Sequence, residues 1–415
     1  FNKLLFYWIV ITLSTSLWFA TSPVDNRNYI LIGTMFFGPF VIICSQKFLP
    51  KIDITVFCLM VLTFAFQYGF HYGEVKTTSI LYSCMFYCYF LAAIRVFISA
   101  KFSPNDLQRL FTCLIIAYAM TILIQQTCVL FELPRFNPVW RYKNPWKLNS
   151  LAAEPSHSAR ILGVLMYGYL IICDLIDGKR MGFFESCRKY KLVWTAFFWT
   201  EITMFSGTAM IIIVIVLARY VKNKNILLTI GLIAITLIVG PYIDFAPIRR
   251  STLFLQAFLT GDTSMMIETD WSASARVVPF ILCLERINLF SIFGWIGAGS
   301  GSTATWMSTI FPNVREGWIS GGLANYTLEY GLILGTLFIW FSGVCCFNKN
   351  SILSSVGLWI MCVVLVGVNM QIVWLCMLVL FLVKNIKLDR DNICVLNLRC
   401  QSFVRIIEWG KRSLM

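Results

Sequence analysis

The chain has 415 residues, of which 58% are hydrophobic and 13% charged, and its mean hydropathy is +0.75. One core could not bury so much apolar side chain, so the composition excludes a soluble protein and predicts a polytopic α-helical membrane protein. The 34 basic and 20 acidic residues give a net charge of +14. Basic residues in short loops explain this charge without nucleic acid. The 15 cysteines are scattered through apolar runs without metal-ligand spacing, which predicts packing residues.

Apolar runs of spanning length occupy the first third of the chain, at 4–20, 29–44, 54–70, 79–98 and 110–131. No small-residue cleavage site follows the first run, which therefore predicts a retained span. The loop with Lys47 and Lys51 and the loop with Lys101 and Arg109 are basic and alternate along the chain. This alternation places both loops on the cytoplasmic side and, by parity, places the segment 132–158 outside.

The remaining apolar runs predict a further set of spans and two hairpins. The run 159–175 leads to a basic loop, and 192–218 is predicted as two short helices that turn at Phe205-Ser206-Gly207-Thr208, with one tilted span as the alternative. The run 226–242 leaves to an external segment, 243–320, and 321–346 re-enters. A second hairpin turns around Asn369-Met370-Gln371 within 352–383. About twelve crossings follow, with a single transmembrane domain, 1–383, and a basic cytoplasmic tail, 384–415.

The first external segment, 132–158, ends in the first candidate site. Pro155 suits the first turn of a helix and disfavours helical geometry at Glu154, so Glu154 is expected at the N-cap of the next span. His157 follows three residues later and Arg160 three residues after His157. Interleaved cations and aromatic rings upstream suit a sugar phosphate: Arg135, Arg141, Lys143, Lys147, Trp140, Tyr142 and Trp146. The alternative is a capped span with an interfacial aromatic belt.

The second external segment, 243–320, carries the second candidate site. A serine-capped helix beginning near Arg276 would aim its N-terminal amides and the guanidinium at an anion. The glycine cluster at 294–301 follows no strand, so it predicts a tight external turn and not a nucleotide site. Beyond it, Glu329 lies in a predicted span, where a carboxylate requires a partner or a polar cavity.

The order of these motifs resembles the O-antigen polymerase and O-antigen ligase superfamily. The motifs are Glu154-Pro155-Ser156, the Ser-Gly turn of the first hairpin, Ser274-Ala275-Arg276, the Phe-Gly-x-x-Gly-x-Gly turn from Phe293 and the Asn-Tyr-x-x-x-x-Gly span from Asn325. The resemblance implies a GT-C-like glycosyltransferase that uses undecaprenyl-diphosphate-linked sugars at the periplasmic face of a bacterial inner membrane. The ligase branch carries a histidine where Ala324 stands, which favours a polymerase. The arginine usual after the hairpin serine is also absent, because Gly207 and Thr208 stand there.

The expected reaction transfers a growing glycan from undecaprenyl diphosphate to a new lipid-linked repeat unit, with inversion. Arg276 is the expected diphosphate clamp, and Glu154 the base or hydroxyl-orienting group with His157 in reserve. Further substrate contacts are expected from Arg141, Arg160, Arg249, Arg286, Asn325 and Tyr326. No acidic cluster predicts a metal, and no cofactor is expected. The expected partners are the lipid-linked oligosaccharide, membrane lipids and a chain-length regulator. The alternatives are an O-antigen ligase and, as a non-enzyme, a flippase for lipid-linked oligosaccharides.

Overall fold

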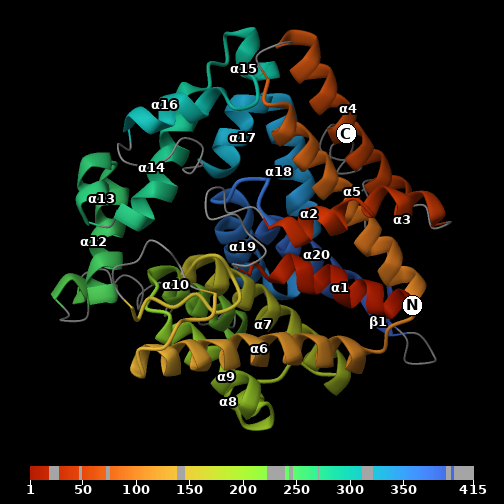
Figure 1. Cartoon of the computed structure of the whole chain (residues 1–415), viewed down its shortest axis with the longest axis vertical. Coiled ribbons are helices and arrows are strands. Elements are labelled where there is room, and N and C mark those ends of the chain that lie inside the picture. Colours follow the sequence, from red (N-terminus) through yellow and green to blue (C-terminus); the bar gives the residue numbers. More distant parts are fainter. Residues whose placement is uncertain are drawn as a thin grey trace, which may run out of the picture.

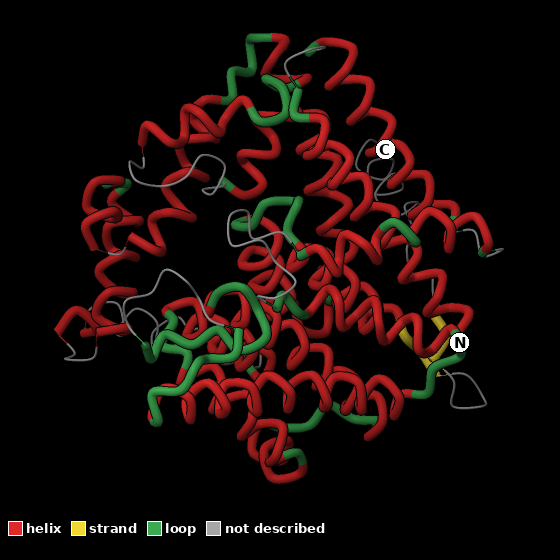
Figure 2. The backbone as a smooth tube through the Cα atoms, in the orientation of Figure 1, coloured by secondary structure: helices red, strands yellow, loops and turns green. Residues whose placement is uncertain are grey.

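The computed structural model describes residues 1–17, 28–45, 49–71, 75–137, 145–221, 239–242, 246–269, 271–310, 321–388 and 394–396. This part of the chain is almost entirely helical, which confirms the predicted all-α class (Figure 2). One antiparallel pair of short strands, β1 (Ile386–Leu388) and β2 (Cys394–Leu396), lies in the predicted C-terminal tail. Residues 389–393 and 397–415 of that tail lie outside the described residues.

The helices of the first half are α1 (Asn2–Ser14), α2 (Tyr29–Met35), α3 (Gly38–Cys44), α4 (Pro50–Phe70), α5 (Thr77–Ala100), α6 (Pro104–Leu130), α7 (Pro155–Asp177), α8 (Phe183–Lys189), α9 (Lys191–Thr203), α10 (Gly207–Leu217) and η2 (Ala218–Tyr220). Those of the second half are η4 (Gly240–Tyr242), α12 (Ala246–Thr260), α13 (Thr263–Thr269), α14 (Trp271–Arg286), α15 (Ile292–Ile296), α16 (Ser302–Ile310), α17 (Gly322–Tyr330), α18 (Leu332–Cys346), η5 (Lys349–Ser351), α19 (Ile352–Trp359), η6 (Ile360–Val364) and α20 (Gln371–Asn385).

Four of the described helices, α4 to α7, are long and apolar enough to cross a membrane, with 21, 24, 27 and 23 residues. A fifth span is possible by length if α18 and the segment Lys349–Val364, which meet at a 75° bend, are counted together. The other apolar runs are divided into shorter helices, such as α1 and α20. Several long apolar helices indicate a membrane protein. The count of twelve crossings and the GT-C-like fold stay predictions.

The most enclosed helix of the bundle is α20. All its residues from Ile372 to Val383 are buried, and it packs against α1, α5, α7 and α18 (Figure 1). The sequence of α20 is apolar on every side, as expected of a helix surrounded by others. The aromatic ring of Trp374 stacks on Phe86 at 5.7 Å and meets Tyr87 edge-on at 5.0 Å. The bundle therefore forms around α20.

Several chain segments that carry basic residues meet at one face of the bundle. Lys3 pairs with Asp106 (2.7 Å), and the amide of Cys394 donates to the carbonyl of Phe102 (2.7 Å), so the N-terminus, the loop before α6 and β2 share this face. Lys384 joins them to the end of α18 through the carbonyl of Val344 (2.7 Å). We call this side the basic face. Lys47 lies outside the described residues, and the placement of the alternate basic loops on the cytoplasmic side stays a prediction.

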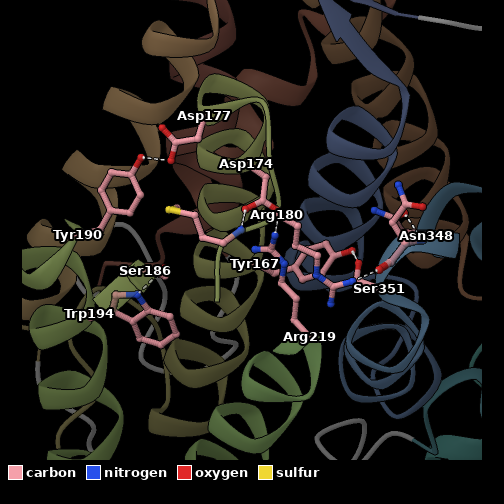
Figure 3. A network of polar contacts seen from close by, with 12 residues as sticks. Tyr167, Asp174, Asp177, Arg180, Ser186, Tyr190, Trp194, Arg219, Asn348 and Ser351 are labelled. Atoms are coloured by element: carbon pink, nitrogen blue, oxygen red, sulfur yellow. Dashed lines mark hydrogen bonds and ion pairs between the residues drawn. The ribbon is translucent and has the colours of Figure 1, made fainter. Parts of the chain in front are cut away.

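A polar network on the basic face ties α7, η2 and η5 together (Figure 3). The guanidinium of Arg219, which is 2% exposed, pairs with the carboxylate of Asp174. Arg180 donates to the carbonyl of Asn350 (2.8 Å), and the hydroxyls of Tyr167 and Ser351 are 2.5 Å apart. These contacts hold the loop after α7 against the loop between α18 and α19.

The other loops meet at the opposite face. The amide of Ser16 donates to the carbonyl of Leu151 (2.8 Å), and the Gln371 side chain donates to the carbonyl of Thr15 (3.1 Å). The glycine-rich turn reaches the start of α5, where the amide of Lys76 donates to the carbonyl of Ser300 (3.1 Å). The candidate sites of both external segments therefore lie away from the basic face.

The first hairpin is confirmed. The chain leaves α9 at Met204, turns through Phe205 with φ of +49° and begins α10 at Gly207. The ring of Trp194 near the start of α9 lies 6.2 Å from that of Tyr220 after α10, so both ends return to the basic face. A single tilted span would have separated these rings by the length of the helix. The exit span predicted at 226–242 lies mostly outside the described residues.

The second hairpin is also confirmed, with a shifted turn. The chain leaves η6 at Leu365 and begins α20 at Gln371, so the turn starts before the predicted Asn369. The thiol of Cys376 contacts the carbonyl of Leu358 (3.9 Å) across the two arms.

The second external segment forms an arc of short helices beside the bundle (Figure 1). In it, α12, α13 and α14 enclose a small apolar core of Ala257, Met266 and Val278. The last of these helices, α14, packs along α17 and joins the arc to the bundle.

Candidate functional site

The arc and the bundle meet where α14 packs on α17, and polar residues of α14, α16 and α17 gather there. The thiol of Cys283 on α14 contacts the side-chain oxygen of Asn325 on α17 (3.9 Å). One turn further along α14, the guanidinium of Arg286 lies 3.7 Å above the ring of Trp306 on α16. Glu329 lies one turn after Asn325. We call Cys283, Arg286, Trp306, Asn325 and Glu329 the α14–α17 site.

Arg286 is the exposed cation of this site. A guanidinium that stacks on an aromatic ring uses its flat face and leaves its in-plane N–H donors at the edge. These donors match the oxygens of a phosphate or carboxylate in a two-pronged geometry. The Arg286–Trp306 pair can therefore bind an anionic group from solvent or from a membrane surface.

Glu329 has the partners that its position in an apolar helix requires. Its carboxylate accepts hydrogen bonds from the hydroxyl and the amide of Thr303 (the amide at 3.4 Å) in the first turn of α16. The first amides of a helix lack partners within the helix and favour a negative charge. Glu329 therefore caps α16 and holds Trp306 near α14.

The glycine-rich turn wraps around the end of α17, which confirms the predicted tight turn. The amides of Ala298 and Gly299 donate to the carbonyls of Leu328 (3.0 Å) and Glu329 (3.1 Å). Gly297 has φ of +97° and Gly299 of +95°, a region that favours glycine. The turn thus satisfies carbonyls that become free where α17 ends.

Two polar residues at the end of α4, Gln67 and the C-cap His71, were not predicted to belong to a site. The Gln67 side chain donates to the carbonyl of Glu329 (3.1 Å) and accepts from the amide of Ser300 (2.7 Å). His71 Nε2 lies 2.9 Å from the carbonyl oxygen of Gly297. The sequence feature that could have indicated this site is the pair of polar side chains one helical turn apart at the end of an apolar run.

The charges of the α14–α17 site act on the buried thiol of Cys283. Burial and, to a smaller extent, the nearby Glu329 carboxylate raise the pKa of this thiol, the Arg286 guanidinium lowers it, and the pKa that results is about 12. Both charged groups therefore lie close to Cys283.

The prediction of a helix that begins near Arg276 is wrong. In the structure α14 begins at Trp271, so Ser272 and Ser274 lie inside the helix. Ser274 is buried and donates to the carbonyl of Met266 (2.5 Å) on α13, so it does not cap the helix. This contact with α13 moves the start of the helix, and the N-terminal amides do not point to an anion beside Arg276. The side chain of Arg276 lies outside the described residues.

At the start of α7, the backbone of Glu154 takes the predicted N-cap position, but its side chain does not cap the helix. Glu154 is extended, with φ of −144°, and its carbonyl accepts from the amides of His157 and Ser158 (both 3.0 Å). Its carboxylate does not bind the first amides of α7 but accepts from the Ser156 hydroxyl at 3.5 Å. Glu154 and His157 are half-buried, whereas Arg160 is 2% exposed and faces the bundle interior.

The loop before Glu154 is held by Gln125 of α6. Gln125 accepts from the amide of Ser150 (2.9 Å) and donates to the side-chain oxygen of Asn149 (3.2 Å). Arg135 donates to the carbonyl of Pro145 (2.9 Å) at the surface of this loop. These contacts hold the loop that leads into α7 in place. Arg141, Lys143, Trp140 and Tyr142 lie outside the described residues.

The predicted site residues fall into separate groups. Arg286 and Asn325 belong to the α14–α17 site, and Tyr326 is buried beside it with its ring 4.7 Å from Tyr330. Glu154, His157 and Arg160 lie at the start of α7, which packs on α6, α10 and α20, apart from α14 in Figure 1. Arg249 is exposed on α12.

One further group, Glu201 of α9, was missed by the sequence analysis. Its side chain is fully buried, and neither carboxylate oxygen has a hydrogen-bond partner among the described residues. A carboxyl in such surroundings is costly. The only indication in the sequence was that Glu201 is a carboxylate within the apolar run 192–218, two residues before the end of α9.

Within the described ranges, no group of three or more His, Cys, Asp or Glu side chains could hold a metal ion. No protein-family profile, curated protein or solved structure matches the chain. The α14–α17 site itself offers a stacked guanidinium, an amide and a capped carboxylate, a set that suits the binding of an anionic, polar ligand.

Proposed function

We propose that the chain is a membrane-embedded glycosyltransferase that polymerises a polysaccharide. It transfers a growing glycan from undecaprenyl diphosphate to the non-reducing-end sugar of a new lipid-linked repeat unit. The observation that supports this proposal best is the meeting of Arg286, Trp306 and Asn325, which come from three separate helices, with Asn325 in the last motif of the resemblance. A diphosphate is already a good leaving group, so the protein must mainly bind it and orient one hydroxyl.

In this proposal Arg286 takes the central role. Its exposed N–H donors bind a phosphate of the lipid carrier, and Asn325 orients a polar group of the sugar. Arg276 lies ten residues earlier on α14, about 15 Å along the helix, and would contact a second anionic group. Glu154 remains the proposed base, with His157 beside it.

The distribution of charge supports an outward-facing site. Short basic loops of membrane proteins stay in the cytoplasm, and the α14–α17 site lies on the face opposite to them. We therefore place the chain in a bacterial inner membrane with the site towards the periplasm. A chain-length regulator remains a proposed partner.

The test uses purified protein in vesicles with a synthetic undecaprenyl-diphosphate-linked repeat unit as the sole substrate. The parent should make a ladder of products, Arg286→Ala should lose it and Arg286→Lys should retain part of it. Arg188→Ala removes an exposed arginine from the basic face and is the matched control. A normal ladder from Arg286→Ala at equal expression would contradict the role of Arg286.

The same assay separates the alternatives. An O-antigen ligase would need a lipid A core acceptor and would make no ladder from repeat units alone. A flippase would make no glycosidic bond with either acceptor but would move labelled repeat units between leaflets. Glu154→Ala and Arg276→Ala test the remaining roles, and normal ladders from both would contradict them.

A further inference from the structure

The segment between α14 and α16 exposes an unusual run of apolar side chains. Five large side chains within seven residues are turned to the surface: Leu289 (54% exposed), Phe290 (101%), Ile292 (62%), Phe293 (54%) and Trp295 (45%). We call residues 289–295 the apolar tip. Exposed apolar patches of this kind mark contact with a partner or a membrane.

The apolar tip has a defined backbone. The hydroxyl of Ser291 caps the short helix α15 by accepting from the amide of Phe293 (3.3 Å), and the Trp295 ring N–H donates to the carbonyl of Leu289 (2.9 Å). A side chain at Gly294 would lie 1.9 Å from the carbonyl oxygen of Asn288. Backbone polar groups of the apolar tip are therefore hydrogen-bonded within the protein, while its apolar side chains point to the surface.

The surroundings of the apolar tip do not suit water. No charged residue occurs from 287 to 310, although an exposed loop is normally rich in charge. Tryptophan and other large apolar side chains in uncharged segments are typical of the interface between membrane and water.

The apolar tip continues a surface that already faces lipid. Large side chains on one side of α4 are exposed at helical spacing: Ile54, Phe57, Val61 and Phe64. A spanning helix with such a stripe presents it to the hydrocarbon. The ring of His71, directly after α4, lies 5.8 Å from that of Phe293, and Figure 1 shows α15 beside this end of α4.

From these observations we infer that the apolar tip inserts into the bilayer leaflet on the face opposite to the basic face. The second external segment is then anchored in lipid between α14 and α16. Its anchor precedes the glycine-rich turn, which holds the end of α17. On the proposed function, this places the α14–α17 site at the height of lipid headgroups, where a lipid-linked phosphate lies.

The experiment measures insertion and needs no activity, so its failure is distinct from failure of the proposed function. The environment-sensitive fluorescent amino acid Anap replaces Phe290 in the full chain, in nanodiscs of phosphatidylethanolamine and phosphatidylglycerol (3:1). Matched positions are Phe64 on the lipid-facing stripe and the exposed Ser264 on α13. Emission at 290 should be blue-shifted from that at 264, and nitroxide-labelled lipids should quench it at least half as strongly as at 64.

Emission at 290 that matches 264 and is not quenched by nitroxide lipids would overturn the inference. A blue shift without lipid quenching would also overturn it, because a protein surface, such as a second copy of the chain, would then cover the tip. Replacement of Ile292 by Anap repeats the measurement at a second position, and only variants that elute with the parent in gel filtration are compared.

Discussion

The backbones of Gly297 and Gly331 lie directly against each other where the glycine-rich turn meets the break between α17 and α18. A Cβ atom on Gly297 would lie 2.7 Å from the amide nitrogen of Gly331, and one on Gly331 would lie 2.2 Å from the carbonyl oxygen of Trp295. Both residues have positive φ, +97° and +92°. The contact fixes the turn, α17 and α18 relative to one another.

Alanine at Gly331 should therefore destabilise the protein strongly. The positive φ and the close backbone contact would each cost about 1–3 kcal/mol, because neither backbone can move away alone. We expect a marked fall in Tm in detergent, measured by the loss of monodisperse protein after heating. Gly33→Ala on α2, where an added Cβ meets nothing within 4 Å, is the control and should keep the parent's Tm or raise it. Equal Tm values for the two variants would contradict the packing argument.

The hairpins could be predicted from the sequence because charge restricts where a chain can turn. Arg219 and Lys191 must lie on one side, and the Ser206-Gly207 pair offers the turn between them. The break at Gly331 could not be predicted, because the apolar run continues through it from 321 to 346. The amides that make this break tolerable come from the glycine-rich turn, about thirty residues earlier, and from the Gln67 side chain.

Removal of Arg95 from its ion pair with Asp53 should destabilise the fold more than removal of both partners. The two side chains are 7% and 8% exposed and 2.8 Å apart, and Arg95 also donates to the carbonyl of Ile42 (2.7 Å). Arg95→Met leaves a buried carboxylate without its cation, which costs about 3–5 kcal/mol. The double variant Asp53→Leu/Arg95→Met should recover most of this loss, measured by Tm in detergent. A double variant less stable than Arg95→Met would show that the pair itself contributes little and that other contacts of Asp53 dominate.

Cys283 should make stability fall as the pH rises above 9. Burial raises its pKa from 9.0 to about 12, so between these values the unfolded chain loses the thiol proton and the folded chain keeps it. The folded state then binds more protons, and the free energy of unfolding decreases with pH, by about 1 kcal/mol up to pH 10. The measurement is Tm between pH 8 and 10 for the parent and for Cys283→Ala, whose slope should be shallower. Equal slopes would contradict a buried, protonated thiol in the α14–α17 site.

The α14–α17 site could be predicted only in part. Arg286 and Asn325 stood out as polar residues in an otherwise apolar chain, so their residue types were a sufficient signal. Their meeting with Trp306 depends on how the arc returns to the bundle, which periodicity does not determine. The serine cap expected near Arg276 failed for the same reason, since α13 binds the Ser274 hydroxyl and α14 begins earlier.

Glu201 should limit stability, because its carboxyl is fully buried on α9 without a partner among the described residues. Glu201→Met keeps the length of the side chain and removes both polar oxygens, so we expect the free energy of unfolding to rise by about 1–3 kcal/mol. Glu185→Met is the control, because that carboxylate is exposed, pairs with Lys179 at 2.7 Å and should leave Tm unchanged. A lower Tm for Glu201→Met would mean that the carboxyl has a stabilising partner. A higher Tm together with loss of the product ladder would mean that the chain keeps a costly carboxyl because its function requires it, since local rules are broken most often at functional sites.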